Sequence, residues 1–177
     1  HEAGHLEFGT FDLPLARLED VSKELTQRYG RPALREVRTL GDMFARYPQP
    51  GLIRDLWALV EDARVEYLLR REYPGLSRDL AVIAKDAVQV RSLGHGMTVR
   101  ELVVDQLLLL STVEAGSLPL PDALKREIMH LWSLCQTIFH PQATAEEAVR
   151  LADRLYVSMD ELLAIRREAI PSPDEAE

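Results

Sequence analysis

Apolar residues recur at helical spacing through most of this chain, and this pattern restricts the fold more than any other feature. Residues 13–30, 52–73 and 121–139 each carry apolar side chains three or four positions apart, as on one face of an α-helix. Alternation of apolar and polar residues, which is typical of a half-buried strand, is scarce. The sequence therefore predicts an all-α fold, a single domain of roughly seven to nine helices.

Capping boxes predict where three further helices begin. In a capping box, a Ser or Thr side chain and a Glu three residues later bond to backbone N–H groups that the first helical turn leaves unpaired. The three pairs are Thr98 with Glu101, Thr144 with Glu147, and Ser158 with Glu161. We also expect a short helix within residues 39–48 and a longer helix over 77–92.

The length of the chain, 177 residues, suits one medium-sized domain that buries a substantial core. We expect residues 1–170 to form this helical domain. Residues 171–177 read PSPDEAE, an acidic and proline-bearing composition that predicts a linker or a disordered tail. Because the sequence does not begin with Met, we interpret it as part of a longer protein.

Charge and hydropathy argue against two classes of partner. The formal net charge is −8, whereas nucleic acids attract basic surfaces, so we expect no nucleic-acid binding. The longest apolar run, 102–113, is interrupted by Asp105 and Gln106 and is too short to span a bilayer. The only cysteine is Cys135, so no disulfide forms within the chain. We therefore expect a reducing, cytoplasmic location and no membrane insertion.

The first five residues, HEAGH, match the H-E-x-x-H pattern of zinc peptidases. On a helix His1 and His5 lie on the same face, one turn apart, so both imidazoles can bind one zinc ion. Glu2 lies beside them, where its carboxylate can accept a proton from a zinc-activated water. The motif predicts His1 and His5 as zinc ligands and Glu2 as the general base of peptide hydrolysis.

A catalytic zinc ion takes three protein ligands, and HEAGH supplies only two. The metzincin extension is excluded, because Gly9 lies one position too late and Phe11 stands where a third His is required. A carboxylate from another helix is the usual alternative. The strongest candidate stretch is 59–69, which carries three carboxylates in an otherwise apolar helix, and these need zinc or an arginine as a counter-charge. The carboxylates are Glu61, Asp62 and Glu66, and the arginine is Arg64.

HEAGH followed by a helix that bears Glu resembles the gluzincin-type zinc metallopeptidases. Together with VEDARVEYLLRREYPGL, it looks more specifically like a bacterial group in which a helical HExxH region precedes a von Willebrand factor A domain. That group is similar to the nitric-oxide-reductase activation (NorD) proteins. The resemblance covers about residues 1–80. It implies His1 and His5 as ligands, Glu61 as the third ligand and Glu2 as the general base.

The chain departs from the gluzincin pattern at one position. The pattern E-x-x-x-D requires Asp at position 65, where this chain has Val65, so Asp62 and Glu66 remain alternatives to Glu61. The resemblance also implies a peptide or protein substrate, with a von Willebrand A domain or a MoxR-type AAA+ ATPase as partner. The alternative function is a helical adaptor or scaffold that docks such a partner and has a structural or vestigial metal site.

Overall fold

The computed structural model describes residues 1–30, 37–76, 78–79, 82, 97–112 and 120–169. These residues contain α-helices and short 3₁₀ turns and no strand, which confirms the predicted all-α fold. The seven described α-helices are α1 (Glu2–Glu7), α2 (Glu19–Tyr29), α3 (Leu40–Phe44), α4 (Pro50–Glu72), α6 (Val99–Thr112), α7 (Lys125–Cys135) and α8 (Ala145–Ala169). Most of the helix predicted over 77–92 and the whole tail predicted over 171–177 lie outside the described residues.

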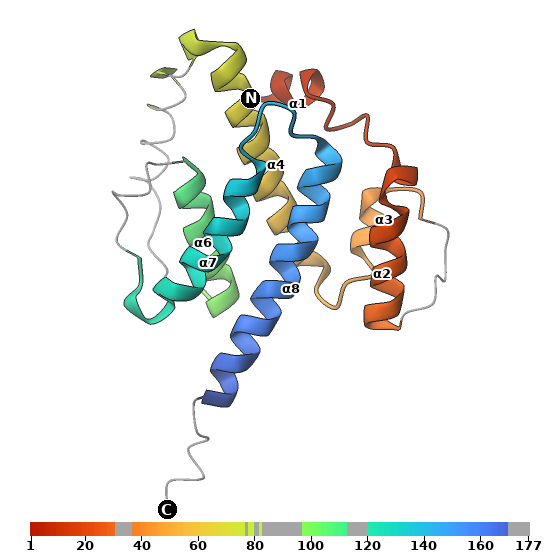
Figure 1. The fold of residues 1–177 in the computed structure, drawn as a ribbon, viewed down its shortest axis with the longest axis vertical. Helices are drawn as coiled ribbons and strands as arrows, with labels where there is room; N and C mark the ends of the chain where they lie inside the picture. The colour runs from red at the N-terminus through yellow and green to blue at the C-terminus, as the bar shows by residue number, and fades with distance from the viewer. Residues whose placement is uncertain (31–36, 77, 80–81, 83–96, 113–119, 170–177) are drawn as a thin grey trace, which may run out of the picture.

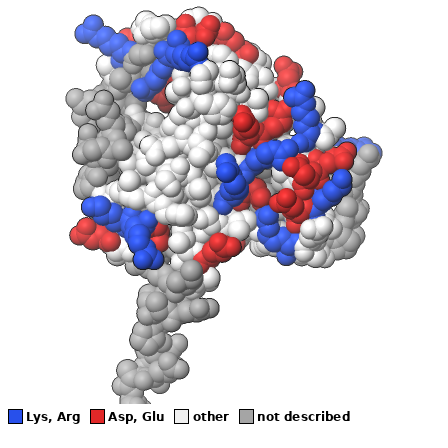
Figure 2. All heavy atoms as spheres, viewed as in Figure 1, with Lys and Arg blue, Asp and Glu red and all other residues white. Residues whose placement is uncertain are grey.

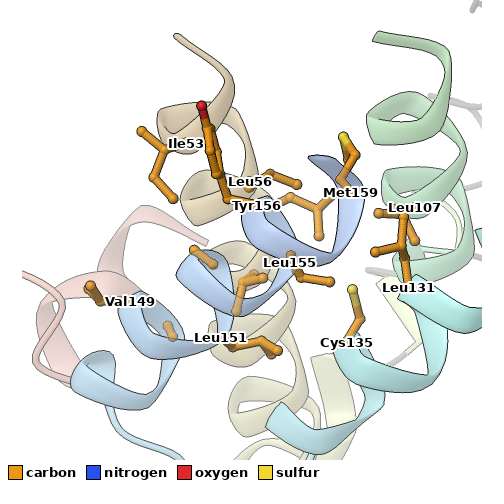
Figure 3. Close-up of a cluster of buried hydrophobic side chains, with 14 of the residues drawn as sticks. Ile53, Leu56, Leu107, Leu131, Cys135, Val149, Leu151, Leu155, Tyr156 and Met159 are labelled. Atoms are coloured by element: carbon orange, nitrogen blue, oxygen red, sulfur yellow. The ribbon is translucent and has the colours of Figure 1, made fainter. Parts of the chain in front are cut away.

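The long helices α4 and α8 pack along each other and form the centre of the fold. Figure 1 shows α6 and α7 on one side of this pair, α2 and α3 on the other, and α1 beside α4. Apolar side chains from all of these helices except α1 meet in one continuous core (Figure 3). Burying one large aliphatic side chain contributes about 1.5–3 kcal/mol, so this shared core holds the helices together as a single domain. Its most buried members include Ile53, Leu56, Leu107, Ile128, Leu131, Leu155 and Met159.

Two of the three predicted capping boxes are confirmed. The Thr98 N–H donates to Glu101 Oε2 at 2.7 Å, and the Glu101 N–H donates to Thr98 Oγ1 at 3.3 Å. The corresponding distances between Thr144 and Glu147 are 2.8 and 3.2 Å. These boxes mark the starts of α6 and α8, because their side chains satisfy the N–H groups of each first turn.

The third predicted box, Ser158 with Glu161, is wrong, since α8 runs through both positions without a break. Leu155, Met159 and Leu163 are all buried and continue one apolar face across the expected boundary. A local capping signal contributes about 1 kcal/mol, which is less than the burial of three core side chains. Packing therefore decides that one long helix forms here.

Charged side chains of opposite sign lie close together on the face shown in Figure 2. Ion pairs join the N-terminal region to α8: Arg17 Nη1 lies 2.9 Å from Glu146 Oε1, and Arg28 Nη1 lies 2.8 Å from Asp153 Oδ1. None of the described helices is both long enough and apolar enough to cross a membrane.

Candidate metal centre

Helix α1 lies against α4 through Gly4, which has no side chain to hold the two helices apart. A Cβ atom at this position would lie 2.8 Å from Val65 Cγ1 and 2.9 Å from Leu69 Cδ1, closer than real Cβ contacts. Both Gly4 and His5 are buried in this contact. The small residue inside HEAGH therefore allows the approach that brings the two histidines beside α4.

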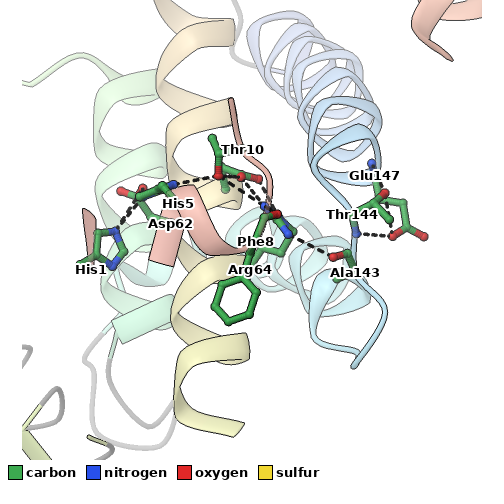
Figure 4. A network of polar contacts seen from close by, with 10 residues as sticks. His1, His5, Phe8, Thr10, Asp62, Arg64, Ala143, Thr144 and Glu147 are labelled. Carbon is green, nitrogen blue, oxygen red and sulfur yellow. Dashed lines mark hydrogen bonds and ion pairs between the residues drawn. The ribbon is translucent and has the colours of Figure 1, made fainter. Parts of the chain in front are cut away.

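Three side chains converge where α1 meets α4 (Figure 4). The Nε2 atoms of His1 and His5 lie 3.1 Å apart. Asp62 Oδ1 of α4 lies 3.2 Å from His5 Nε2 and 3.5 Å from His1 Nε2. His5 is only 8% exposed, whereas His1 is exposed, so the cluster has one buried and one solvent-facing side.

The separations within this cluster match those of ligands on one metal ion. Two imidazoles and a carboxylate form a common donor set for zinc at catalytic sites. Ligand atoms about 2.0–2.1 Å from a zinc ion at tetrahedral angles lie about 3.3 Å from one another. Within the described part of the chain, His1, His5 and Asp62 form the only group of three or more such side chains whose ligand atoms come this close.

Negative charge surrounds Asp62. Burial raises the pKa of its carboxyl, and the charges of Glu61 and Glu2 raise it further, whereas the neighbouring His5 lowers it. Glu2 is exposed at the start of α1. A cation held by the cluster would favour the charged form of Asp62 and offset the repulsion from the nearby glutamates.

Glu61 points into a different set of contacts, although it is adjacent to Asp62 in sequence. Its Oε2 accepts from Arg64 Nε at 2.8 Å, and its Oε1 accepts from Arg64 Nη2 at 2.5 Å. Oε1 also accepts from the Thr10 hydroxyl at 2.5 Å. Both carboxylate oxygens are thus engaged, and the counter-charge of Glu61 is Arg64.

Arg64 links three parts of the fold through its buried guanidinium. Besides the contacts with Glu61, Nη1 donates to the carbonyl of Ala143, just before α8. Nη2 donates to the carbonyl of Phe8, just after α1. Arg64 is thus the salt-bridge partner of Glu61, and its contacts tie the end of α1 and the start of α8 to α4.

Glu66, the remaining candidate ligand, faces Arg70 one turn further along α4. Arg70 Nε donates to Glu66 Oε1 at 3.1 Å, and Nη2 of the same arginine makes a shorter contact with that oxygen. This is an i,i+4 ion pair along one face of α4. Glu66 is not among the residues that surround the two histidines.

Thr10 also makes polar contacts in this centre, although no motif in the sequence indicates it. His5 Nδ1 lies 3.1 Å from Thr10 Oγ1, so Thr10 connects a histidine of the motif to Glu61. Gly9 adopts a left-handed conformation with φ of 72°, and the Thr10 N–H donates to the His5 carbonyl. This is the Schellman pattern at a helix C-terminus, and a Gly shortly after the motif is the one local signal for it.

Comparison with protein-family models, with curated proteins and with solved structures gives no match for this chain.

Proposed function

We propose that this chain is the zinc-binding region of a metallopeptidase-like protein of the HExxH type. In this proposal His1, His5 and Asp62 bind the ion, and Glu2 is the general base. Asp62 replaces Glu61 as the third ligand, since both oxygens of Glu61 already accept hydrogen bonds from Arg64 and Thr10.

One observation carries the proposal: three ligand atoms on two helices lie 3.1, 3.2 and 3.5 Å apart. These spacings lie near the edge length of a zinc tetrahedron, about 3.3 Å, and they are also the distances of direct hydrogen bonds and ion pairs among the three side chains. The two histidines also occupy the i and i+4 positions of one helix, as the H-E-x-x-H pattern requires.

Bound zinc would lower the pKa of a coordinated water to about 7 and polarise a substrate carbonyl. The protein supplies the remaining functions. Asp62 contributes negative charge to the ligand set, and Glu2, exposed beside His1, accepts a proton from the water and passes it to the leaving amine. The reaction class is hydrolysis of a peptide bond in a peptide or protein substrate.

Metal analysis of the purified protein tests the zinc site directly. After removal of loosely bound metal, we expect about one zinc per chain and a thermal midpoint that falls when EDTA is added, since a ligand of the folded state stabilises it. His5→Ala should lose both effects. His130→Ala is a matched control, because His130 is exposed on α7, away from the cluster. Absence of stoichiometric zinc together with an unchanged midpoint in EDTA would reject the proposal.

A second candidate function is a docking module whose metal site is structural. The observation that favours it is the exposure of two large apolar side chains near the cluster, Leu6 and Phe11, each 69% exposed. The ring of Phe11 lies 6.4 Å from that of His5. Exposed apolar groups of this size often mark contact surfaces. A von Willebrand A domain or a MoxR-type AAA+ ATPase is the partner proposed for this function.

Glu2→Gln separates the two candidates, because it removes the base and leaves every proposed metal ligand in place. In a peptidase this variant keeps its zinc and loses hydrolysis of a peptide substrate. In a docking module it keeps both its zinc and its partner binding. The double variant Leu6→Ser with Phe11→Ser should weaken docking in a docking module while leaving the metal content unchanged.

A further inference from the structure

The side chain of Thr10 lies between a proposed zinc ligand and a buried ion pair. Its Oγ1 is 3.1 Å from His5 Nδ1 and 2.5 Å from Glu61 Oε1. All three residues are buried, so water does not replace these contacts easily. The arrangement joins His5 to Arg64 through two intervening side chains.

A count of hydrogens determines the direction of each bond. A threonine hydroxyl carries one hydrogen and two lone pairs, and a carboxylate can only accept. Glu61 forms a buried ion pair with Arg64 and accepts two hydrogen bonds from its guanidinium. The single hydroxyl hydrogen of Thr10 therefore goes to Glu61, and toward His5 the Thr10 oxygen is an acceptor. Arg64 Nη2, 3.5 Å from the same oxygen, is also a donor, which is consistent with this direction.

We propose that Thr10 is a positioning residue that holds His5 in the tautomer with its hydrogen on Nδ1, leaving the Nε2 lone pair free for a metal ion. Nε2 is the nitrogen that faces His1 and Asp62. The metal-binding part of this inference rests on the proposed function. On the Nδ1 side the tautomer follows from the contacts with Thr10 and Glu61, whereas on the Nε2 side the Asp62 carboxylate, 3.2 Å away, is a competing acceptor for the ring hydrogen when no cation is bound.

The rest of the fold keeps Thr10 in place. Gly9 turns the chain back after α1, so that the Thr10 N–H reaches the carbonyl of His5. Arg64 bonds the carbonyl of Phe8 at 3.1 Å and thereby ties the same turn to α4. Partners outside a metal's own ligands commonly fix the tautomer and ring orientation of a ligating His, and their loss typically lowers metal affinity about 10–100-fold.

Nitrogen-15 NMR of a metal-free Asp62→Ala variant, which lacks the competing acceptor at Nε2, measures the tautomer without reference to zinc. At a pH above the range in which imidazoles ordinarily titrate, the two ring nitrogens of each neutral histidine give distinct shifts. A His5→Asn variant identifies the signals of His5. In the Asp62→Ala background we expect Nδ1 of His5 to be protonated and Nε2 to be free. When Thr10→Val, which keeps the shape but loses the hydroxyl, is added to this background, the Nε2-protonated form should gain population.

Zinc titration supplies the second readout. Thr10→Val should bind zinc about 10–100-fold more weakly than the wild type, and Thr10→Ser, which restores the hydroxyl, should recover the wild-type affinity and tautomer. Thr26→Val is the control for loss of a threonine hydroxyl elsewhere, because Thr26 is exposed on α2. Circular dichroism checks that each variant is folded.

Two results would overturn the proposal: a His5 that is protonated mainly on Nε2 in the Asp62→Ala background, or a folded Thr10→Val variant in that background with the same tautomer. If Thr10→Val does not fold, the Asp62→Ala spectrum and Thr10→Ser still decide the question. Failure of the proposed function alone gives a different result. In that case the Nδ1-protonated tautomer is observed in the Asp62→Ala background, and zinc does not bind to the wild type.

Discussion

Glu61 and Arg64 lie three residues apart on α4 and form an ion pair in which each side chain is only 1% exposed. The pair is held by two contacts, and Arg64 also donates to the backbone carbonyls of Phe8 and Ala143. A buried ion pair contributes little compared with an apolar pair, because both charges lose their hydration. Removing only one of the two residues is costly, since the charge of the other is then left buried without a partner.

Arg64→Ala should therefore destabilise the protein severely. Removal of one partner of a buried pair typically costs about 3–5 kcal/mol, and here the backbone carbonyls of Phe8 and Ala143 also lose a donor. Urea unfolding followed by circular dichroism measures the change in the free energy of unfolding. Arg70→Ala is the matched control, because the Arg70–Glu66 pair is partly exposed and i,i+4 pairs of this kind contribute about 0.3–0.5 kcal/mol. Equal losses in the two variants would contradict the structural role assigned to Arg64.

Gly4→Ala should loosen the contact between α1 and α4. The added methyl group would lie within 2.9 Å of atoms of both Val65 and Leu69, and Val65 is a branched, fully buried side chain with little freedom to move. Overpacking of this kind typically costs about 1–3 kcal/mol, despite the better helix propensity of Ala. We expect a lower free energy of unfolding and, because α1 carries both histidines, weaker zinc binding.

Gly51→Ala provides the control for this substitution. Gly51 lies in the first turn of α4, is exposed, and has open space where a Cβ would be. Ala is favoured over Gly in a helix by about 0.5–1 kcal/mol, so this variant should be as stable as the wild type or slightly more stable. If Gly4→Ala behaves in the same way as Gly51→Ala, the two helices are not in tight contact at Gly4.

The sequence predicts the fold well because its signals are local. Apolar spacing and the boxes at Thr98 and Thr144 depend on residues three or four positions apart, and Gly30 ends α2 in the left-handed conformation that its lack of a side chain allows. The box expected at Ser158 fails because the same local signal competes with core packing along α8. That competition depends on neighbours that are distant in sequence.

In the candidate site, too, local sequence indicates some features and tertiary packing sets the others. HEAGH identifies His1 and His5 from local spacing, and the carboxylates of α4 are also visible in the sequence. Whether Glu61 or Asp62 faces the histidines depends on how α4 is rotated relative to α1, which tertiary packing sets. The contact of Thr10 with Glu61 joins residues 51 positions apart, so no local pattern indicates it.

Asp62→Asn should reduce zinc affinity by more than about 100-fold, beyond the range typical for loss of a partner outside the ligand set. The amide is nearly the same size but has no charge, and it is a poor ligand for zinc. Asp55→Asn is the matched control, because Asp55 is exposed on the same helix, two turns before Asp62. Competition with a chromophoric chelator measures the affinities. Wild-type affinity in Asp62→Asn, with loss of binding in Glu66→Gln, would identify Glu66 as the third ligand instead.

Tyr47 should make the protein sensitive to alkaline pH. Its hydroxyl donates to Asp153 Oδ1 at 2.8 Å, and burial, together with the charge of Asp153, raises the pKa of Tyr47 well above its ordinary value. The ring is fully buried. A group whose pKa is raised by folding binds its proton more tightly in the folded state. Stability from Tyr47 is therefore complete below the unfolded pKa of about 10 and is lost as pH rises above it.

Tyr47→Phe isolates this effect. At neutral pH the variant should lose about 1 kcal/mol with the hydrogen bond, while Asp153 keeps its contact with Arg28. Above about pH 10, its free energy of unfolding should fall less steeply than that of the wild type, by up to about 1.4 kcal/mol per pH unit. Urea unfolding over a series of alkaline buffers measures both slopes. Tyr67→Phe, which leaves the Tyr47–Asp153 bond in place, should keep the wild-type slope, and an unchanged slope in Tyr47→Phe would show that the Tyr47 hydroxyl does not stay protonated in the folded protein.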